Sequence, residues 1–370
     1  MYLEKINLIN YRNINNLLLD LSPNLNILIG NNGQGKTNLL ESIYLMGTAT
    51  SHRSSVDKEL INWDKEKALV QILLNKKDYS LKLAMKFEGS RKKIEINNTP
   101  IDKVSELIGN LNVVLFSPED LYLVKGGPAK RRDFINIEVS QVSKYYYHLL
   151  NEYRHILNQR NNYLKTIREK RTKNYDILEV WDDKLVEIGS KIIRKRLEVV
   201  DKLQILARLN HRKITNGSEN LFLEYESSLT KEIDKDKIHL IFRKELVNNR
   251  EKEIIRGYTL YGPHRDDLIL KINDIDLRKY GSQGQQRTAA LALKLAELEF
   301  MKSETGEYPV LLLDDVFSEL DYSRRAMLID LIADKIQTFI TATDIDIIDR
   351  IANCNYKIFQ VKEGKFTIRG

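Results

Sequence analysis

Cysteine is nearly absent from this sequence, since Cys354 is the single thiol in 370 residues. One thiol cannot form an intramolecular disulfide, and it cannot build a zinc site from cysteine ligands. No apolar run reaches the roughly 18 residues that cross a bilayer. The start, MYLEKINLIN, lacks both the basic region and the cleavage site of a secretory signal. We therefore expect a soluble, cytoplasmic protein without a membrane partner.

A strong excess of one charge is also missing. The 59 Lys and Arg residues nearly balance the 52 Asp and Glu residues, which gives a formal net charge of +7. Apolar residues make up 42% of the chain, as in ordinary globular proteins. At this length we expect roughly two domains. A polyanionic partner would have to be bound through local basic clusters, because the overall charge is small.

Hydrophobic patterning divides the chain into three parts. Residues 1–117 contain strand-like runs and a glycine loop, residues 118–256 contain long polar helices, and strands return over residues 257–370. Four runs in the last part, DLILKIN, VLLLDD, TFITAT and KIFQV, alternate with helices as in a doubly wound sheet. We expect an α/β head with a mixed sheet and flanking helices, interrupted by a helical arm domain. The first arm helix is expected to run unbroken from Pro128 for about 60 Å, at ~1.5 Å per residue.

The sequence GNNGQGKT at residues 30–37 carries the clearest chemistry. It matches G-x-x-x-x-G-K-[ST], with a strand expected before it and a helix after it. Backbone N–H groups of such a loop surround phosphates, the lysine charge reaches the β and γ oxygens, and the hydroxyl can bind Mg²⁺. The predicted nucleotide-binding residues are Gly30, Asn31, Asn32, Gly33, Gln34, Gly35, Lys36 and Thr37.

The strand-like run PVLLL ends in two carboxylates, Asp314 and Asp315. At the carboxyl end of a buried strand beside a P-loop, Asp314 can hold Mg²⁺ through water and Asp315 can orient the attacking water. Paired carboxylates also cap strands in solvent, but a P-loop in the same chain favours the catalytic interpretation. We predict Lys36, Asp314 and Asp315 as catalytic residues, and Thr37 with Asp314 as the metal site.

A second glycine-containing loop, GSQGQQR at residues 281–287, precedes the amphipathic run TAALALKLAELEF. The loop is too polar to fill a core, and it ends at a helix N-terminus. Unpaired N–H groups and the helix dipole favour an anion there, above all a phosphate.

Taken together, these elements resemble an ABC-type ATPase head of the SMC-like class. Within that class the sequence is similar to the RecF family of bacterial recombination mediators over essentially its whole length. The resemblance is carried by YRNI, IGNNGQGKTNLLESIY, LFSPEDL, KGGPAKRRDFI, YGPHRDDL and GSQGQQRTAALALKLAE.

The resemblance implies a DNA-binding protein of recombinational repair, DNA replication maintenance and the SOS response, with ATP and Mg²⁺ as cofactors. Such proteins form ATP-dependent homodimers, hydrolyse ATP slowly with stimulation by DNA, and bind gaps or duplex/single-strand junctions without sequence preference. They act with RecO and RecR to load RecA. The nearest alternative is an SMC-like ATPase clamp of another DNA-repair pathway.

The resemblance also assigns roles to single residues. Ser282, Gln283 and Gly284 would contact the ATP held by the second subunit, with Ser282 acting in catalysis. Ser318 and Asp321 would lie at the dimer seam. Arg12 would lie near the bound phosphates, and a surface arginine beside a turn is the alternative for that position.

Three departures from the usual ABC head follow from the same alignment of motifs. Asp315 stands where a longer glutamate is usual, which predicts slow hydrolysis. Thr343 replaces a switch histidine. Two valines at positions 113 and 114 occupy the place of an expected glutamine, leaving Ser117 and Glu119 as weak candidates for metal or water contacts.

Basic residues cluster in SRKK (90–93), AKRR (129–132), REKRTK (168–173) and KIIRKR (191–196). Such clusters can displace counterions from DNA phosphates without reading bases. One charged run is usually a solvated helix face, but four of them and the resemblance favour DNA. The spacing of Tyr145, Tyr146 and Tyr147 indicates packing between helices and not a base-stacking platform.

Three other functions explain the sequence less completely. A transporter-energising subunit would carry a shorter helical subdomain. A long-armed clamp with a zinc hook would need extended heptads and a Cys-x-x-Cys apex. A P-loop kinase would leave the loop at residues 281–287 unexplained.

Overall fold

The computed structural model describes residues 1–169, 175–230, 233–319, 324–325, 328–329, 335–343 and 355–369. Asp321 and Cys354 lie outside these residues, as does the side chain of Ser318. The chain forms two compact units: Met1–Asp120 with Glu297–Gly370, here called the head unit, and Leu121–Ala296, here called the arm unit. Among the described residues, no helix could cross a membrane.

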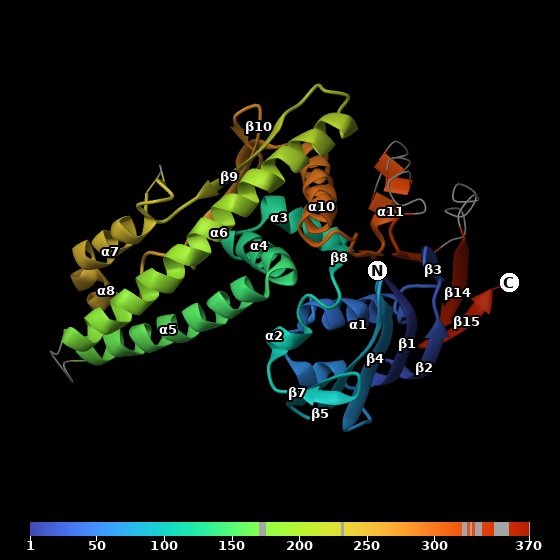
Figure 1. Ribbon diagram of the computed structural model, residues 1–370. Helices are drawn as coiled ribbons and strands as arrows, with labels where there is room; N and C mark the ends of the chain where they lie inside the picture. The colour runs from blue at the N-terminus through green and yellow to red at the C-terminus, as the bar shows by residue number, and fades with distance from the viewer. Residues whose placement is uncertain are drawn as a thin grey trace. The chain divides into compact units, whose positions relative to one another are not determined.

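A six-stranded core sheet of the head unit has the order β15-β14-β3-β13-β12-β8. Figure 1 labels four of its strands, β3, β8, β14 and β15. Parallel pairing joins all its strands except the edge strand β15, which is antiparallel. Every residue of β3, β8, β12 and β13 is buried, as parallel strands covered on both faces require. The strands are β3 (Leu25–Ile29), β8 (Val113–Phe116), β12 (Val310–Leu313), β13 (Thr338–Ala342), β14 (Tyr356–Lys362) and β15 (Lys365–Arg369).

A second, antiparallel sheet of the head unit has the order β2-β1-β4-β5-β6-β7. Burial alternates strictly along β4, because one face of this sheet packs on the core. The elements are β1 (Tyr2–Tyr11), β2 (Ile14–Asp20), β4 (Lys67–Asn75), β5 (Ser80–Glu88), β6 (Arg91–Ile96) and β7 (Thr99–Ile101), with the helices α1 (Lys36–Thr48), η1 (Asp57–Leu60), α2 (Val104–Leu107), η2 (Pro118–Asp120) and α11 (Val316–Glu319). The expected α/β head and its first strands are confirmed.

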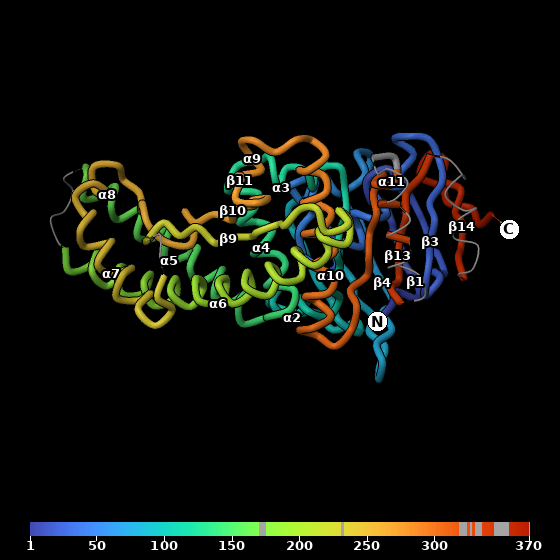
Figure 2. The backbone as a smooth tube through the Cα atoms, turned by 90° about the horizontal axis from the view of Figure 1, so that it is seen from above, coloured from blue at the N-terminus to red at the C-terminus, as the bar shows by residue number. Residues whose placement is uncertain are grey.

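In the arm unit, two long helices lie side by side in both views (Figures 1 and 2). These are α5 (Lys144–Arg168) and α6 (Asp176–Ile214), and both are amphipathic with buried faces toward each other. The other helices are α3 (Leu121–Lys125), α4 (Pro128–Val142), α7 (Ile238–Asn248), α8 (Arg250–Arg256), α9 (Leu277–Tyr280) and α10 (Gln283–Thr305), whose last residues belong to the head unit.

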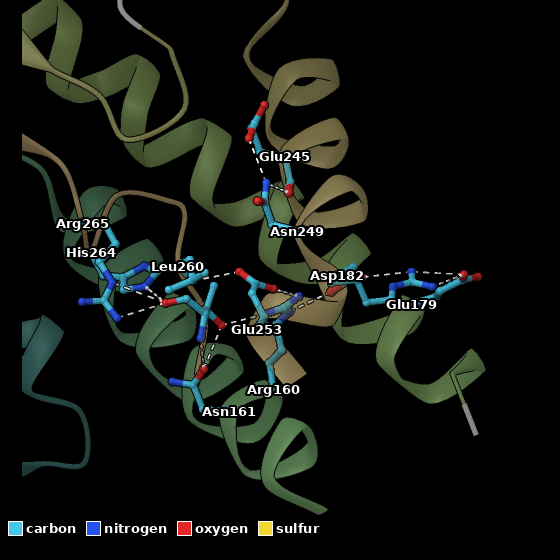
Figure 3. A network of polar contacts seen from close by, with 12 residues as sticks. Arg160, Asn161, Glu179, Asp182, Glu245, Asn249, Glu253, Leu260, His264 and Arg265 are labelled. Atoms are coloured by element: carbon cyan, nitrogen blue, oxygen red, sulfur yellow. Dashed lines mark hydrogen bonds and ion pairs between the residues drawn. The ribbon is translucent and has the colours of Figure 1, made fainter. Parts of the chain in front are cut away.

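An ion-pair network buried within the arm unit joins three of these helices (Figure 3). Arg160 of α5 donates to Asp182 Oδ1 of α6 and to Glu253 Oε2 of α8, both at 2.7 Å, and to Thr259 Oγ1 at 2.8 Å. Arg160 and Glu253 have no exposed surface. Because a buried charge is tolerated only when it is paired, this network fixes the three helices to one another.

The expected unbroken arm helix is wrong. It is two helices, α4 and α5, separated at Ser143, whose backbone is extended (φ −143°, ψ 98°). The Ser143 hydroxyl accepts a hydrogen bond from the N–H of Tyr146 at 3.2 Å and so caps the second helix. Serine favours this position because it satisfies an otherwise unpaired N–H group.

DLILKIN does not join the core sheet, contrary to expectation. It forms β10 (Asp267–Ile272), which pairs with β9 (Leu221–Glu226) and β11 (Ile275–Asp276) in a separate sheet of the arm unit. Arg131 of α4 holds β10 through two hydrogen bonds of 2.7 Å to the Asp267 carboxylate. The arm unit, which contains this sheet, spans residues 121–296. The sequence suggested residues 118–256 for the arm domain.

Candidate nucleotide site

The P-loop lies between β3 and α1 and curves around its own lysine. Lys36 is the first residue of α1 and is only 8% exposed. Its Nζ donates to the carbonyl oxygen of Asn31 at 3.0 Å and also to that of Gly30. Gly35 has φ 112°, in the left-handed region that glycine tolerates. The loop thus combines backbone N–H groups with a cation, a combination suited to phosphate.

The outer part of the loop is accessible. Asn31, Asn32 and Gly33 are exposed. Gln34 is held by two backbone N–H groups. Its side-chain oxygen accepts a hydrogen bond from Glu363 N at 2.7 Å, and its carbonyl oxygen accepts one from Gly364 N at 2.9 Å. The turn between β14 and β15 therefore supports the loop from the edge of the same sheet.

Thr37 and Asp314 lie together, although they are far apart in the sequence. The Thr37 hydroxyl donates to Asp314 Oδ1 at 2.9 Å, at the end of β12. Burial raises the pKa of Asp314, against the hydrogen bonds from Thr37 and Thr341 and the charge of Arg53, which lower it. A hydroxyl beside a carboxylate offers the oxygen ligands that Mg²⁺ prefers.

Thr341 of β13 is a site residue that sequence reasoning missed. Its hydroxyl donates to Asp314 Oδ1 at 3.0 Å and accepts from the N–H of Asp315 at 2.8 Å. Asp315 itself is exposed and has φ 53°. Thr341 therefore holds the side chain of Asp314 and the backbone of Asp315. The available signal was a polar residue in the buried strand TFITA, two positions before the exposed Thr343.

Arg12 is bound to a buried glutamate of α1. Its guanidinium donates to Glu41 Oε1 at 2.7 Å and to Glu41 Oε2 at 3.0 Å, and also to the Glu59 carbonyl at 2.8 Å. Glu41 has no exposed surface, and burial would raise its pKa. Hydrogen bonds from Arg12 and Ser51 and the charge of Arg53 outweigh burial and lower that pKa. Sequence reasoning missed Glu41, although a glutamate on the buried face of a helix requires a partner.

Beside this cluster is a cavity of about 800 Å³ in the head unit. Arg12, Asn13 and Asn38 are among its lining residues, and the Asn38 side chain donates to Asn13 Oδ1 at 2.8 Å. A side chain at Gly35 would collide with Asn13, so the cavity adjoins the P-loop directly. The nearly fully exposed Trp63 also lines it.

The loop at residues 281–287, here called the signature loop, belongs to the arm unit. Ser282 caps α10: its hydroxyl accepts from Gln285 N at 3.2 Å, and its N–H donates to Gln285 Oε1 at 3.0 Å. This reciprocal pair is a capping box. Ser282, Gln283 and Gly284 are all exposed, so their outer surface can meet a ligand.

Other predicted candidates lie in less suitable environments. Val113 and Val114 are fully buried in β8 and offer no polar group. Ser117 N donates to Asp120 Oδ2 at 2.7 Å, and Glu119 is exposed. The structure therefore gives neither Ser117 nor Glu119 a contact with the site residues described above.

Two arginines of the basic clusters are structural. The first is Arg131, which binds the Asp267 carboxylate. The second is Arg196, which is only 2% exposed and donates to Tyr146 Oη at 3.0 Å and to Asn136 Oδ1 at 2.9 Å. Tyr146 is buried, as its packing role predicted, while Tyr145 is 61% exposed. The residues that stay exposed in the basic clusters include Arg91, Lys93, Lys130, Arg168, Lys191 and Arg194.

Comparison with known proteins gives a consistent result. The family model described as RecF/RecN/SMC N terminal domain matches residues 2–367. The chain is 58% identical to the DNA replication and repair protein RecF of Halothermothrix orenii over 370 residues, and 46% identical to that of Staphylococcus carnosus over 367 residues, each match covering 99% of both proteins.

Solved structures agree with these matches. A structure of the recombination mediator protein RecF with ATP in the RecFOR pathway superposes with a TM-score of 0.92 at 35% identity, covering 100% of this chain and 98% of that one. An Smc head domain from Pyrococcus furiosus superposes with a TM-score of 0.56 at 16% identity, covering 100% and 96%. The Smc similarity concerns the fold alone.

Proposed function

Because the chain belongs to the RecF family of DNA replication and repair proteins, we propose that it is an ATP- and Mg²⁺-dependent DNA-binding mediator of recombinational repair. The observation that carries the nucleotide assignment is the 2.9 Å hydrogen bond between Thr37 of the P-loop and Asp314. It joins the two parts of the site that an ABC-type ATPase requires. The ATP in the related RecF structure supports the same assignment.

In this proposal the residues of the head unit bind and orient ATP. Backbone N–H groups of residues 30–35 and the Lys36 ammonium hold the phosphates, and Arg12 adds positive charge nearby. Thr37 would bind Mg²⁺ directly and Asp314 would bind it through water. Bound there, Mg²⁺ would neutralise charge that develops on the transferring phosphoryl group. The cavity beside Gly35 is large enough for the nucleoside part.

Hydrolysis is proposed to be slow and stimulated by DNA. Asp315, the candidate for orienting water, has a short side chain on a backbone fixed by Thr341. The signature loop would complete the site of a second copy, with Ser282 contacting its γ-phosphate and Gln283 and Gly284 beside it. This arrangement requires an ATP-dependent homodimer, and the exposure of these three residues supports it.

Asp314→Asn separates this catalytic role from stability. The folded pKa of Asp314 is raised above 3.8, so its contribution to stability is present below that value and is lost as pH rises through the folded pKa. At neutral pH the ionised carboxylate therefore costs stability. Asparagine retains an oxygen acceptor for both threonines, so the melting temperature should stay equal or rise. Mg²⁺-dependent hydrolysis should fall on the order of a hundredfold or more.

Thermal melting and phosphate release against Mg²⁺ concentration check this expectation. Asp276→Asn, which changes a carboxylate of the arm unit outside the site, is a control for the loss of one charge. A wild-type rate for Asp314→Asn at saturating Mg²⁺ would contradict the metal assignment.

We further propose that the dimer binds duplex DNA at gaps or single-strand junctions in the cytoplasm, and that it acts there with RecR and RecO to load RecA. The related structure described as part of the RecFOR pathway supports these partners. The exposed basic residues of α6 and the neighbouring clusters supply candidate contacts to the DNA backbone.

DNA affinity should fall steeply with salt and depend little on sequence. Each phosphate contact releases counterions, so each contact adds about −0.9 to the slope of log K against log salt concentration. Binding isotherms with ATP between 50 and 200 mM salt, on two duplexes of unrelated sequence, measure this. Arg194→Gln removes an exposed cation of α6 and should make the slope shallower by about 1 if it contacts a phosphate. An affinity that is insensitive to salt would rule out the backbone mode.

A further inference from the structure

The side chain of Gln285 holds the signature loop and a second segment at once. Its Oε1 accepts from Ser282 N at 3.0 Å, while its Nε2 donates to Glu219 Oε1 at 2.9 Å. Gln285 is partly buried, whereas residues 282–284 are exposed. The loop therefore has an outer surface for a ligand and an inner contact with the rest of the arm unit.

Glu219 lies in the connection between α6 and β9, and its side chain is 25% exposed. Its Oε2 lies 3.8 Å from Nε2 of His211, a buried residue in the last turn of α6. Arg212 also donates to Asn220 Oδ1 at 3.1 Å, and Gly217 N donates to the Arg212 carbonyl at 2.8 Å. Glu219 thus lies against the C-terminal end of α6, between two residues that are hydrogen-bonded to Arg212.

The chemistry of the pair sets the orientation of the Gln285 amide. An ionised glutamate can only accept hydrogen bonds, so the amide must present its NH₂ group to Glu219. Its oxygen is then left for Ser282 N. A bond to a carboxylate is charge-assisted and stronger than a bond between neutral groups. Glu219 therefore determines how Gln285 holds the loop.

We propose that Glu219 and Gln285 are positioning residues that couple the arm helix α6 to the signature loop. A displacement of the end of α6, such as DNA binding on the arm would cause, is passed through Glu219 and Gln285 to Ser282. DNA would in this way control the half-site that the loop offers to a second copy. The inference rests on the proposed function of the loop in an ATP-dependent dimer.

Exchanging the two side chains tests the coupling. Gln285→Glu places two carboxylates against each other and should lower DNA-stimulated ATP hydrolysis by at least about tenfold, equivalent to about 1.4 kcal/mol. ATP binding to the monomer, which uses only the P-loop, should stay within about twofold, and hydrolysis without DNA should fall less than DNA-stimulated hydrolysis. Combining Gln285→Glu with Glu219→Gln restores one donor facing one carboxylate, and DNA stimulation should return to within about threefold of wild type.

The pH dependence distinguishes repulsion from a change in loop shape. In Gln285→Glu the two carboxylates raise one another's pKa, so the defect should shrink as pH falls and one of them is protonated. Glu224→Gln on β9, which loses only a surface contact with Lys271, is the matched control and should behave as wild type. Should Gln285→Glu not fold, Glu219→Gln alone, which permits the amide to reverse, should still lower DNA stimulation.

Two results would overturn the inference. One is a folded double variant in which DNA stimulation stays lost. The other is an equal loss of hydrolysis with and without DNA in Gln285→Glu, which would make the pair part of the loop's shape only. A wild-type protein that shows neither ATP-dependent dimers nor DNA stimulation would instead refute the proposed function itself, so the two failures are distinct.

Discussion

Lys36→Ala should abolish ATP hydrolysis and weaken ATP binding on the order of a hundredfold or more, as loss of a preorganised charge at a reacting phosphate typically does. The Lys36 ammonium lies inside the curve of the P-loop and is nearly fully buried. Burial lowers its pKa, against the charges of Asp315 and Asp314. Removing the cation should therefore leave the melting temperature almost unchanged, while binding of a fluorescent ATP analogue and phosphate release are lost.

Lys67→Ala is the control for this variant, since Lys67 forms an exposed ion pair with Glu88 on the second sheet of the head unit. Like Lys36→Ala, it removes one lysine charge, but on β4 and outside the P-loop. If Lys36→Ala hydrolysed ATP at the wild-type rate, the P-loop assignment would be incorrect.

Ser282→Arg is expected to leave ATP binding by the monomer nearly intact and to abolish both dimerisation and hydrolysis. A bulky cation on the exposed signature loop would block the γ-phosphate site of a second copy, whereas the P-loop is unchanged. Sizing the protein with and without ATP and Mg²⁺, alongside nucleotide binding, measures the two effects separately.

Mixing Ser282→Arg with Lys36→Ala makes this test decisive. In a mixed dimer one composite site has both an intact P-loop and an intact signature loop, and the other site has neither. Partial ATPase activity should return if the loop works across the interface and one intact site holds the pair together.

The structure supplies the necessary control. Because the Ser282 hydroxyl caps α10, replacing it with a side chain that cannot cap, such as alanine or arginine, costs about 1 kcal/mol of stability. Ser282→Ala loses the same cap without adding bulk or charge, so it should retain more dimer formation than Ser282→Arg. Loss of ATP binding by monomeric Ser282→Arg, with no rescue on mixing, would show that the loop serves its own P-loop.

Much of the site could be predicted because its parts lie at ends of elements. The carboxyl ends of parallel strands meet at one edge of a sheet, so a P-loop after β3 and an acidic pair after β12 implied the contact of Thr37 with Asp314. Thr341 and Glu41 could not be found in the same way. Each is a buried polar residue whose partner is determined by tertiary packing and not by local sequence.

The fold shows the same division between local and distant information. The alternating pattern of DLILKIN correctly indicated a strand, but pattern alone does not choose the partner of a strand. Its neighbour β9 comes from LFLEYE, a short run that follows the long helix α6. Similarly, a polar stretch with helical spacing does not reveal that Ser143 ends one helix and begins another.

The position of β3 has a consequence for synthesis of the chain. Its neighbours in the core sheet are β13 and β14, which end at residues 342 and 362. At about 5–20 residues per second, β3 waits roughly 20–70 s on the ribosome before both strands exist. The arm unit is one continuous segment and is free to fold during that interval. The strand that precedes the P-loop is thus separated from both of its sheet neighbours by most of this interval, and its apolar side chains have no partner strands in the core sheet until β13 and β14 are made.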